Sequence, residues 1–317
     1  MRFSLTSDQT GLRDAVRDLL ADVCPPAVVR AAWSGPTPGV WGRLAELGLF
    51  GAAVPEAAGG LGLSETDVVP LLMETGYAAV PHPVAETMAV AAPLLERADV
   101  TAGTVRVAVA RSGAPVPYGR DADLVLVLDD ASVRAVTGGR TAVDTVDGSL
   151  AAARVDGTGG GYAALVSDDP RIVRLAAARL DLANAAQLVG LGRRMLDLTT
   201  AYVGARQQFG VPVGSFQAIK HHLADALLRL EFATPAVLAA GWELAERTDD
   251  SARAVSLAAV LAAEAATAVA RAAIQCHGAI GYTVEYDLHL YAKRAWALAA
   301  AVPVDAHLAH LADALEI

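Results

Sequence analysis

Two segments in the second half of the chain carry side chains suited to binding a phosphate-bearing ligand. Arg206 to Ala226 reads RQQFGVPVGSFQAIKHHLADA, and Gln275 to Arg294 reads QCHGAIGYTVEYDLHLYAKR. The guanidinium of Arg206 is a planar fork that matches the geometry of phosphate, and Gln217 can hydrogen-bond the same region. The first segment therefore offers a cation and an amide of the kinds that contact phosphate groups.

The glycines of the second segment permit a close approach of the backbone. Gly278 and Gly281 tolerate positive φ, and Gln275 supplies amide contacts. Ordinary alternatives stay open, in which Arg206 is a solvated residue at a helix end and Gln217 is a polar residue at a helix start. In the same alternative, the glycines form a helix-ending turn.

Composition excludes several classes of function. The 317 residues carry a formal net charge of -10, whereas a nucleic-acid-binding protein normally displays a basic face. Cys24 and Cys276 are the only cysteines, and neither they nor the histidines have the spacing of a metal site. Ala254 to Ala273 is strongly apolar, but Glu264 and Arg271 interrupt it, so we expect a buried helix and no membrane span. The N-terminus shows no secretory signal, which predicts a cytoplasmic protein.

The patterns along the chain predict three regions. Apolar residues recur at helical spacing in residues 1–100, which we expect to form a helical domain. Residues 101–170 contain short β-branched runs, VRVAVA and DLVLVL among them, which predict a small β domain. Long alanine-rich helical patterns in residues 171–317 predict an antiparallel bundle.

Both segments resemble motifs of the acyl-CoA dehydrogenase family. The first is similar to the pattern RxxFGxxxxxxQxxxxxLA, and the second to QxxGGxGY followed by an acidic residue. Trp41 to Ser64 resembles the stretch between the family's early helices. The resemblance implies a mainly α fold with a small central β domain: an N-terminal helical domain, a reduced β domain and a C-terminal four-helix bundle.

The resemblance also implies FAD, bound at a subunit interface, and an acyl thioester substrate. Ala279 stands where the family has its second glycine, so its Cβ can crowd the dinucleotide. The cofactor contacts that the resemblance implies are at Arg206, Gln208, Phe209, Gln217, Gln275, Gly278 and Ala279.

The family's catalytic base is missing from both of its usual positions. Members remove the α proton of the thioester with a carboxylate while the flavin takes the β hydride. That glutamate follows the motif glutamine by 27 residues, here Val302, or precedes the motif arginine by 26, here Leu180. Asp181 is a weaker candidate for the base, against the alternative of an acid near a helix N-terminus that is stabilised by the helix dipole.

The central domain lacks the family's loop of the type TEPxxGSD and its later Trp-x-Thr, which cover the flavin ring. Family motifs at the adenine end reach across the dimer interface to a neighbour's FAD. The resemblance thus favours a subunit of a heteromeric dehydrogenase, an α2β2 heterotetramer with a larger catalytic subunit, as in actinobacterial steroid side-chain oxidation. Electrons would pass to an electron-transfer flavoprotein.

Three alternatives stay open. The first is a self-sufficient homodimer that acts on an acyl-CoA or acyl-carrier-protein thioester, with Asp181 or Glu243 as base. The second is a flavin-free structural or binding homologue. The third is an unrelated helical scaffold, which explains the alanine-rich helices but not two motifs in this order and spacing.

Overall fold

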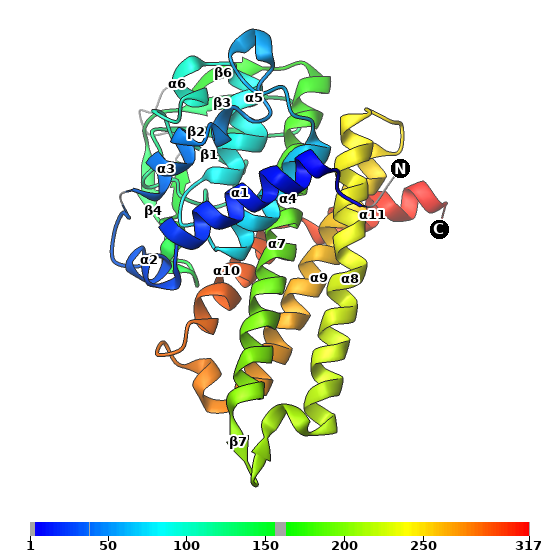
Figure 1. The fold of residues 1–317 in the computed structure, drawn as a ribbon. Helices are drawn as coiled ribbons and strands as arrows, with labels where there is room; N and C mark the ends of the chain where they lie inside the picture. The colour runs from blue at the N-terminus through cyan, green and yellow to red at the C-terminus, as the bar shows by residue number, and fades with distance from the viewer. Residues whose placement is uncertain (1–3, 38, 156–162, 317) are drawn as a thin grey trace.

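Helices, then strands, then long helices follow one another along the chain in the computed structural model (Figure 1). It describes residues 4–37, 39–155 and 163–316. The predicted fold class is confirmed: the structure is mainly helical with a small central β region. The first helices are α1 (Ser7–Val23), α2 (Pro26–Ala31), α3 (Val40–Glu46), α4 (Glu65–Tyr77), η3 (Glu86–Ala91, a π-helix), α5 (Ala92–Leu95) and α6 (Ala98–Thr101), with 3₁₀ turns η1 (Leu49–Gly51) and η2 (Glu56–Ala58).

Capping side chains fix the starts of α1 and α4. Thr6 and Gln9 form a capping box at α1, and Ser64 and Asp67 form another at α4. Gln9 Nε2 also donates to Asp67 Oδ1 at 2.9 Å, so the two caps are joined. The hydrogen bond aligns the starts of two helices that are far apart in the sequence.

The central region contains a four-stranded sheet in the order β1-β2-β3-β6. β1 and β2 are parallel, β2 and β3 are antiparallel, and β3 and β6 are antiparallel with a register shift between Val133 and Arg134. The strands are β1 (Val107–Arg111), β2 (Leu124–Leu128), β3 (Val133–Val136) and β6 (Ala163–Ser167), beside the pair β4 (Arg140–Ala142) and β5 (Ala153–Val155) and the turn η4 (Gly148–Leu150). The two predicted β-branched runs are therefore β1 and β2.

Long antiparallel helices form the last part of the chain, as predicted. They are α7 (Pro170–Ala205), α8 (Gln217–Ala245), α9 (Ser251–His277), α10 (Leu288–Ala301) and α11 (Val304–Leu315), with β7 (Gln207–Gln208), β8 (Val211–Pro212) and the turns η5 (Val213–Ser215) and η6 (Gly278–Tyr282). By length and composition alone, Ser251–Tyr282 could cross a membrane. However, α9 packs against α7, α8, α10 and α11, which accounts for its apolar faces as those of a core helix.

Two glycines let α4 and α7 cross with their backbones in contact. A Cβ added at Gly76 would overlap the backbone of Gln187, and one added at Gly190 would overlap the carbonyl of Met73. Because no side chain separates the helices here, α4 lies directly on the buried part of α7.

A buried arginine on α10 joins the three parts of the fold. The side chain of Arg294 is 1% exposed, and its Nε forms an ion pair with the equally buried Asp147. Its Nη1 donates to Tyr118 Oη and to the carbonyl of Val80, both at 2.9 Å, and its Nη2 donates to Ser149 Oγ at 2.8 Å. With these partners the charge is satisfied inside the chain.

Candidate functional site

A tight hairpin after α7 carries the first predicted motif. Gln207 pairs with Pro212 and Gln208 with Val211, which leaves Phe209 and Gly210 as the turn residues. Both have positive φ, 54° and 80°, the signature of a type I′ turn. Phe209 adopts this conformation without being glycine, and 93% of its surface is exposed. The structure thus holds a large apolar ring outward at the tip of the hairpin.

Arg206 lies at the end of α7, where its backbone ends the helix and its side chain is exposed. Its amide donates to the carbonyl of Tyr202 at 2.9 Å, and its carbonyl accepts from Val213 at 2.7 Å. Within the described part of the chain, its guanidinium has no ion pair. Gln208 is exposed too and donates to the carbonyl of Gln207 at 2.8 Å. The backbone is fixed while the cationic side chain is available.

The other four predicted contact residues lie at the same end of the bundle. Gln217 is the first residue of α8, and Gln275 is two residues before the end of α9. Gly278 follows α9 with φ 63°, and a Cβ there would meet open space, while Ala279 belongs to η6. All four are exposed. Of the two glycines considered for this turn, only Gly278 has positive φ. A Cβ added at Gly281 would lie 3.0 Å from His277 Cβ, so this glycine allows a close approach instead.

An aromatic cluster holds the two motifs side by side. Tyr202, one turn before Arg206, stacks on His277 with the ring centroids 4.3 Å apart, and Tyr286 lies within 5.6 Å of both rings. His277 is buried, and burial lowers the pKa of its ring. The hairpin after α7 and the turn after α9 therefore share the lower end of the bundle (Figure 1).

An open groove of about 380 Å³ runs between α8 and α9 and reaches the second motif. Its walls include Gln275, His222, Asp225, Arg229 and Arg271. Neither arginine has an ion pair among the residues that the structure describes. Neither arginine is among the contacts predicted from the sequence. Helical spacing is a signal for Arg271, because it lies four residues before Gln275 on the same helix face.

The two usual positions of the family's base are apolar and buried. Leu180 lies inside α7 and is 6% exposed, and Val302, at the end of α10, is 8% exposed. Neither side chain can take up a proton. The structure therefore offers no carboxylate at these positions.

Asp181 is held in an ion pair. Its Oδ2 lies 2.6 Å from Arg111 Nη2 and 3.6 Å from His307 Nε2. Burial lowers the pKa of His307, whose Nδ1 lies 3.0 Å from Ser256 Oγ. The alternative of an acid near a helix N-terminus is wrong, because α7 begins at Pro170 and Asp181 is three turns inside it.

Glu243, the other acid considered as a base, is engaged locally. The Thr248 hydroxyl donates to Glu243 Oε2 just beyond the end of α8. Such a contact is typical of a side chain that stabilises a helix terminus.

Comparison with protein families and curated proteins gives consistent matches. The family model described as "Acyl-CoA dehydrogenase, N-terminal domain" matches residues 6–100, and "Acyl-CoA dehydrogenase, C-terminal domain" matches residues 173–301. The acyl-CoA dehydrogenase FadE34 of Mycobacterium tuberculosis is 35% identical over 92% of this chain, which spans only 45% of that relative's length. The acyl-CoA dehydrogenase IpdE2 of the same organism is 35% identical over 90% of this chain and 89% of its own length.

Solved structures give the same fold. The ChsE4–ChsE5 complex from Mycobacterium tuberculosis includes a chain with a TM-score of 0.87, 24% identity and coverage of 100% of this chain and 99% of its own. A variant of the Tcur3481–Tcur3483 steroid ACAD gives a TM-score of 0.85 and 25% identity, with 98% of both chains covered.

Proposed function

Because this chain belongs to the acyl-CoA dehydrogenase family, we propose that it is a subunit of an FAD-dependent enzyme that forms the α,β double bond of an acyl thioester. In this proposal the chain contributes contacts to the adenine and pyrophosphate end of the FAD of a larger catalytic subunit. The subunits form an α2β2 heterotetramer in the cytoplasm.

One observation carries the proposal: the positions suited to the cofactor are exposed, whereas the positions of the base are buried and apolar. Arg206, Gln208, Phe209, Gln217, Gln275, Gly278 and Ala279 all lie on the surface. Leu180 and Val302 lie inside the fold. An arrangement that offers cofactor contacts outward and has apolar side chains at both usual positions of the base suits a chain that completes the site of another subunit.

The chain's own residues fit one end of FAD. Arg206, Arg229 and Arg271 are exposed cations without a carboxylate partner among the described residues, which suits a pyrophosphate. Amides at Gln217 and Gln275 suit polar groups of a nucleotide, and Phe209 offers an apolar face to its rings. When bound, the flavin supplies the acceptor for the β hydride.

Proton removal at the α carbon is assigned to the partner. Asp181 is paired with Arg111, and Glu243 accepts a hydrogen bond from Thr248, so each acid already has a role inside the fold. A base must reach the α carbon to within hydrogen-bonding range. The self-sufficient alternative is therefore less well supported than the heteromer.

The similar structures favour a steroid-type or other bulky acyl thioester as substrate. One neighbour at 25% identity is described as a steroid ACAD and carries the names of two proteins. We propose the same arrangement for this chain, with an electron-transfer flavoprotein as the electron acceptor.

The visible absorption spectrum tests the proposal. The chain is purified alone and, separately, after co-expression with a full-length acyl-CoA dehydrogenase subunit encoded beside it. We expect flavin bands only in the co-purified complex, with fewer flavins than chains, and bleaching of those bands by an acyl-CoA substrate.

Two outcomes would contradict the proposal. A lone chain that is yellow and bleaches with an acyl-CoA has a complete site of its own. A chain that stays colourless with every candidate partner is a flavin-free homologue.

A further inference from the structure

A cavity of about 180 Å³ lies beneath α1, between α4, α7 and α10. Arg194, which lines the cavity from α7, lies about three turns before the hairpin. None of the predicted cofactor contacts lines the cavity. Its walls are mainly apolar and include Leu20, Cys24, Pro26, Tyr77, Arg194 and Tyr291. Burial raises the pKa of Cys24 to about 12, so its thiol adds a neutral wall.

Arg194 brings an uncompensated positive charge to this cavity. Its guanidinium carbon lies 5.2 Å from the ring centroid of Tyr77 and 5.3 Å from that of Tyr291. Its Nε is buried and has no hydrogen-bond partner, whereas the guanidinium also hydrogen-bonds two phenol side chains, Tyr77, with Nη1 3.4 Å from Oη, and Tyr291. No carboxylate forms an ion pair with it in the described ranges.

This arrangement leaves Nε, on one edge of the guanidinium, without an acceptor. Aromatic rings attract a cation through their faces and do not satisfy the N–H groups that point outward in its plane. A buried N–H group without a partner costs free energy, and an anion that accepts from it removes that cost. Arg194 is therefore prepared for an acceptor that the chain itself does not provide.

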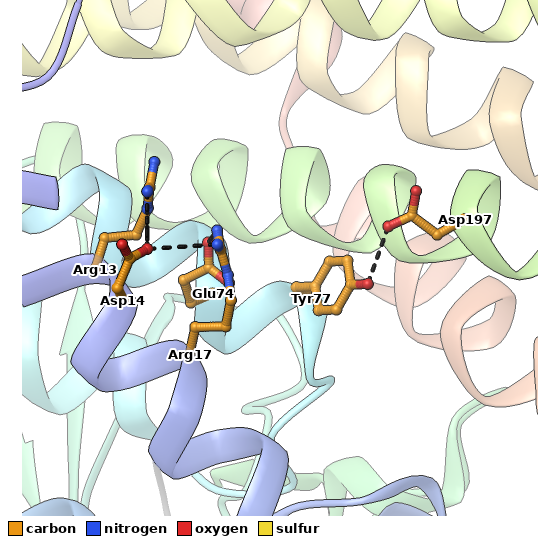
Figure 2. Close-up of polar contacts among 6 residues, drawn as sticks. All are labelled: Arg13, Asp14, Arg17, Glu74, Tyr77 and Asp197. Atoms are coloured by element: carbon orange, nitrogen blue, oxygen red, sulfur yellow. Dashed lines mark hydrogen bonds and ion pairs between the residues drawn. The ribbon is translucent and has the colours of Figure 1, made fainter. Parts of the chain in front are cut away.

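The nearest acids are already engaged. Glu74 lines the cavity, but Arg17 binds it with Nη2 2.7 Å and Nε 3.1 Å from its two carboxylate oxygens. Asp197 accepts from Tyr77 Oη at 2.9 Å (Figure 2). Because Arg17 neutralises the charge of Glu74, repulsion from this carboxylate does not cancel the attraction of an anion to Arg194.

A second, more polar cleft of about 430 Å³ adjoins the cavity on the outside. Arg17, Glu74 and Tyr77 line both spaces, so these three side chains form the wall between them. Figure 2 shows the ion pair and the tyrosine along this wall, on α1 and α4 beside α7. The side chain of Arg17 is 44% exposed, so this wall reaches solvent.

We propose that this cavity binds a compact apolar monocarboxylate, with the ring or alkyl body against Leu20 and Tyr291 and the carboxylate on Arg194. The chemistry that selects the ligand is the combination of an apolar enclosure and one cation whose Nε has no acceptor. The site is separate from the proposed FAD contacts and does not depend on them.

Isothermal titration with cyclohexanecarboxylate tests this site, with cyclohexanecarboxamide as the uncharged probe of the same shape. We expect the acid to bind at least roughly tenfold more tightly than the amide, because only the acid gives a charge-assisted hydrogen bond. Arg194→Gln should remove this preference. Arg174→Gln, which deletes an exposed charge from the same helix, should keep it.

A second variant keeps the test decisive if Arg194→Gln folds poorly. Ala21→Leu enlarges an exposed residue of α1 that lines the cavity, so it should weaken binding without loss of stability. Equal binding of acid and amide, or no binding of either, overturns the proposal. Unchanged preference for the acid in Arg194→Gln overturns it as well.

Discussion

The middle of helix α7 is buried by the rest of the chain, whereas its last turns are largely exposed. Every residue from Leu180 to Gly192 is buried, whereas the last turns bury one residue per turn, Met195, Thr199 and Val203. In the enclosed part Asp181 has an arginine partner within the fold. At the exposed end Arg206 has none among the described residues. The charge of Asp181 is paired within this chain, whereas that of Arg206 is free for another molecule.

This contrast separates stability from ligand binding along one helix. Substitutions in the enclosed part should lower the free energy of unfolding, because they create overlap or leave a charge without its partner. Substitutions of exposed polar side chains at the exposed end should leave the unfolding free energy nearly unchanged and act on cofactor binding.

Gly190→Ala should have the largest effect. The added Cβ overlaps the Met73 carbonyl and lies 2.7 Å from the Tyr77 amide, so α4 and α7 must move apart. Overpacking a core typically costs about 1–3 kcal/mol, and a backbone clash belongs at or above the upper end. Urea unfolding followed by circular dichroism measures the loss.

Gly204→Ala is the matched control at the exposed end of the same helix. A Cβ there meets nothing within 4 Å, so we expect stabilisation by about 0.5–1 kcal/mol from the higher helix propensity of alanine. If both variants changed stability equally, the close contact of α4 with α7 would be wrong.

Glu86→Gln should have the next largest effect and should depend on pH. Glu86 lies in η3, which packs on α7, and burial raises its pKa to about 7. Its protonated form contributes stability that is present below about pH 4.5 and is lost as pH rises through about 7. Glutamine keeps the uncharged state, so the variant should gain about 3 kcal/mol over the parent at about pH 8 and almost nothing near pH 4.5.

His82 makes the parent's own pH profile a poor test. Burial lowers its pKa to about 4, so its contribution is present above about pH 6.5 and is lost as pH falls through 4. Glu86 and His82 change the parent's stability with pH in opposite directions. The contribution of His82 is the same in parent and Glu86→Gln, so it cancels in the difference between their unfolding free energies. Glu46→Gln, which removes an exposed carboxylate, is the control, and it should change stability by less than about 0.5 kcal/mol. A flat difference for Glu86→Gln would show that Glu86 is ionised in the fold.

The periodic parts of the fold could be predicted from the sequence. The helical spacing predicted in residues 1–100 includes α4, and the runs VRVAVA and DLVLVL overlap β1 and β2. Apolar spacing is a local signal, so it specifies such elements directly. The division into domains at residues 100 and 170 stays a prediction, as do the seven cofactor contacts.

Long-range polar pairs could not be predicted. Arg294 meets Asp147 across 147 positions, and Arg111 meets Asp181 across 70. No local pattern records which charges will meet once strands and helices pack. The π-helix at Glu86–Ala91 was missed for a related reason, since its helical pattern resembles that of an α-helix.

Asp181→Asn should have a smaller effect and decides between two roles for this acid. Arg111 is one-third exposed, so the loss of the ion pair should cost roughly 1–2 kcal/mol, less than for a fully buried pair. Turnover by the assembled complex should stay within about twofold of the parent. Loss of turnover by orders of magnitude with the fold intact would instead identify Asp181 as the base.

Arg206→Gln should have the smallest effect on stability, within about 0.5 kcal/mol, because its side chain is exposed and has no ion pair in the described ranges. Its effect should be on the cofactor. Loss of one charge-assisted contact to a pyrophosphate should weaken FAD binding by the complex roughly tenfold. Titration of the flavin-depleted complex with FAD, followed by flavin fluorescence, gives the dissociation constant.

Arg174→Gln separates a specific contact from a general change of charge. Arg174 is exposed near the start of α7, away from the hairpin, and its loss changes the net charge by the same amount. FAD affinity should fall in Arg206→Gln and stay unchanged in Arg174→Gln. Equal weakening by both variants would reduce the role of Arg206 to long-range attraction, which about 0.15 M salt would largely screen. No change in either would mean that the exposed end of α7 does not reach the cofactor.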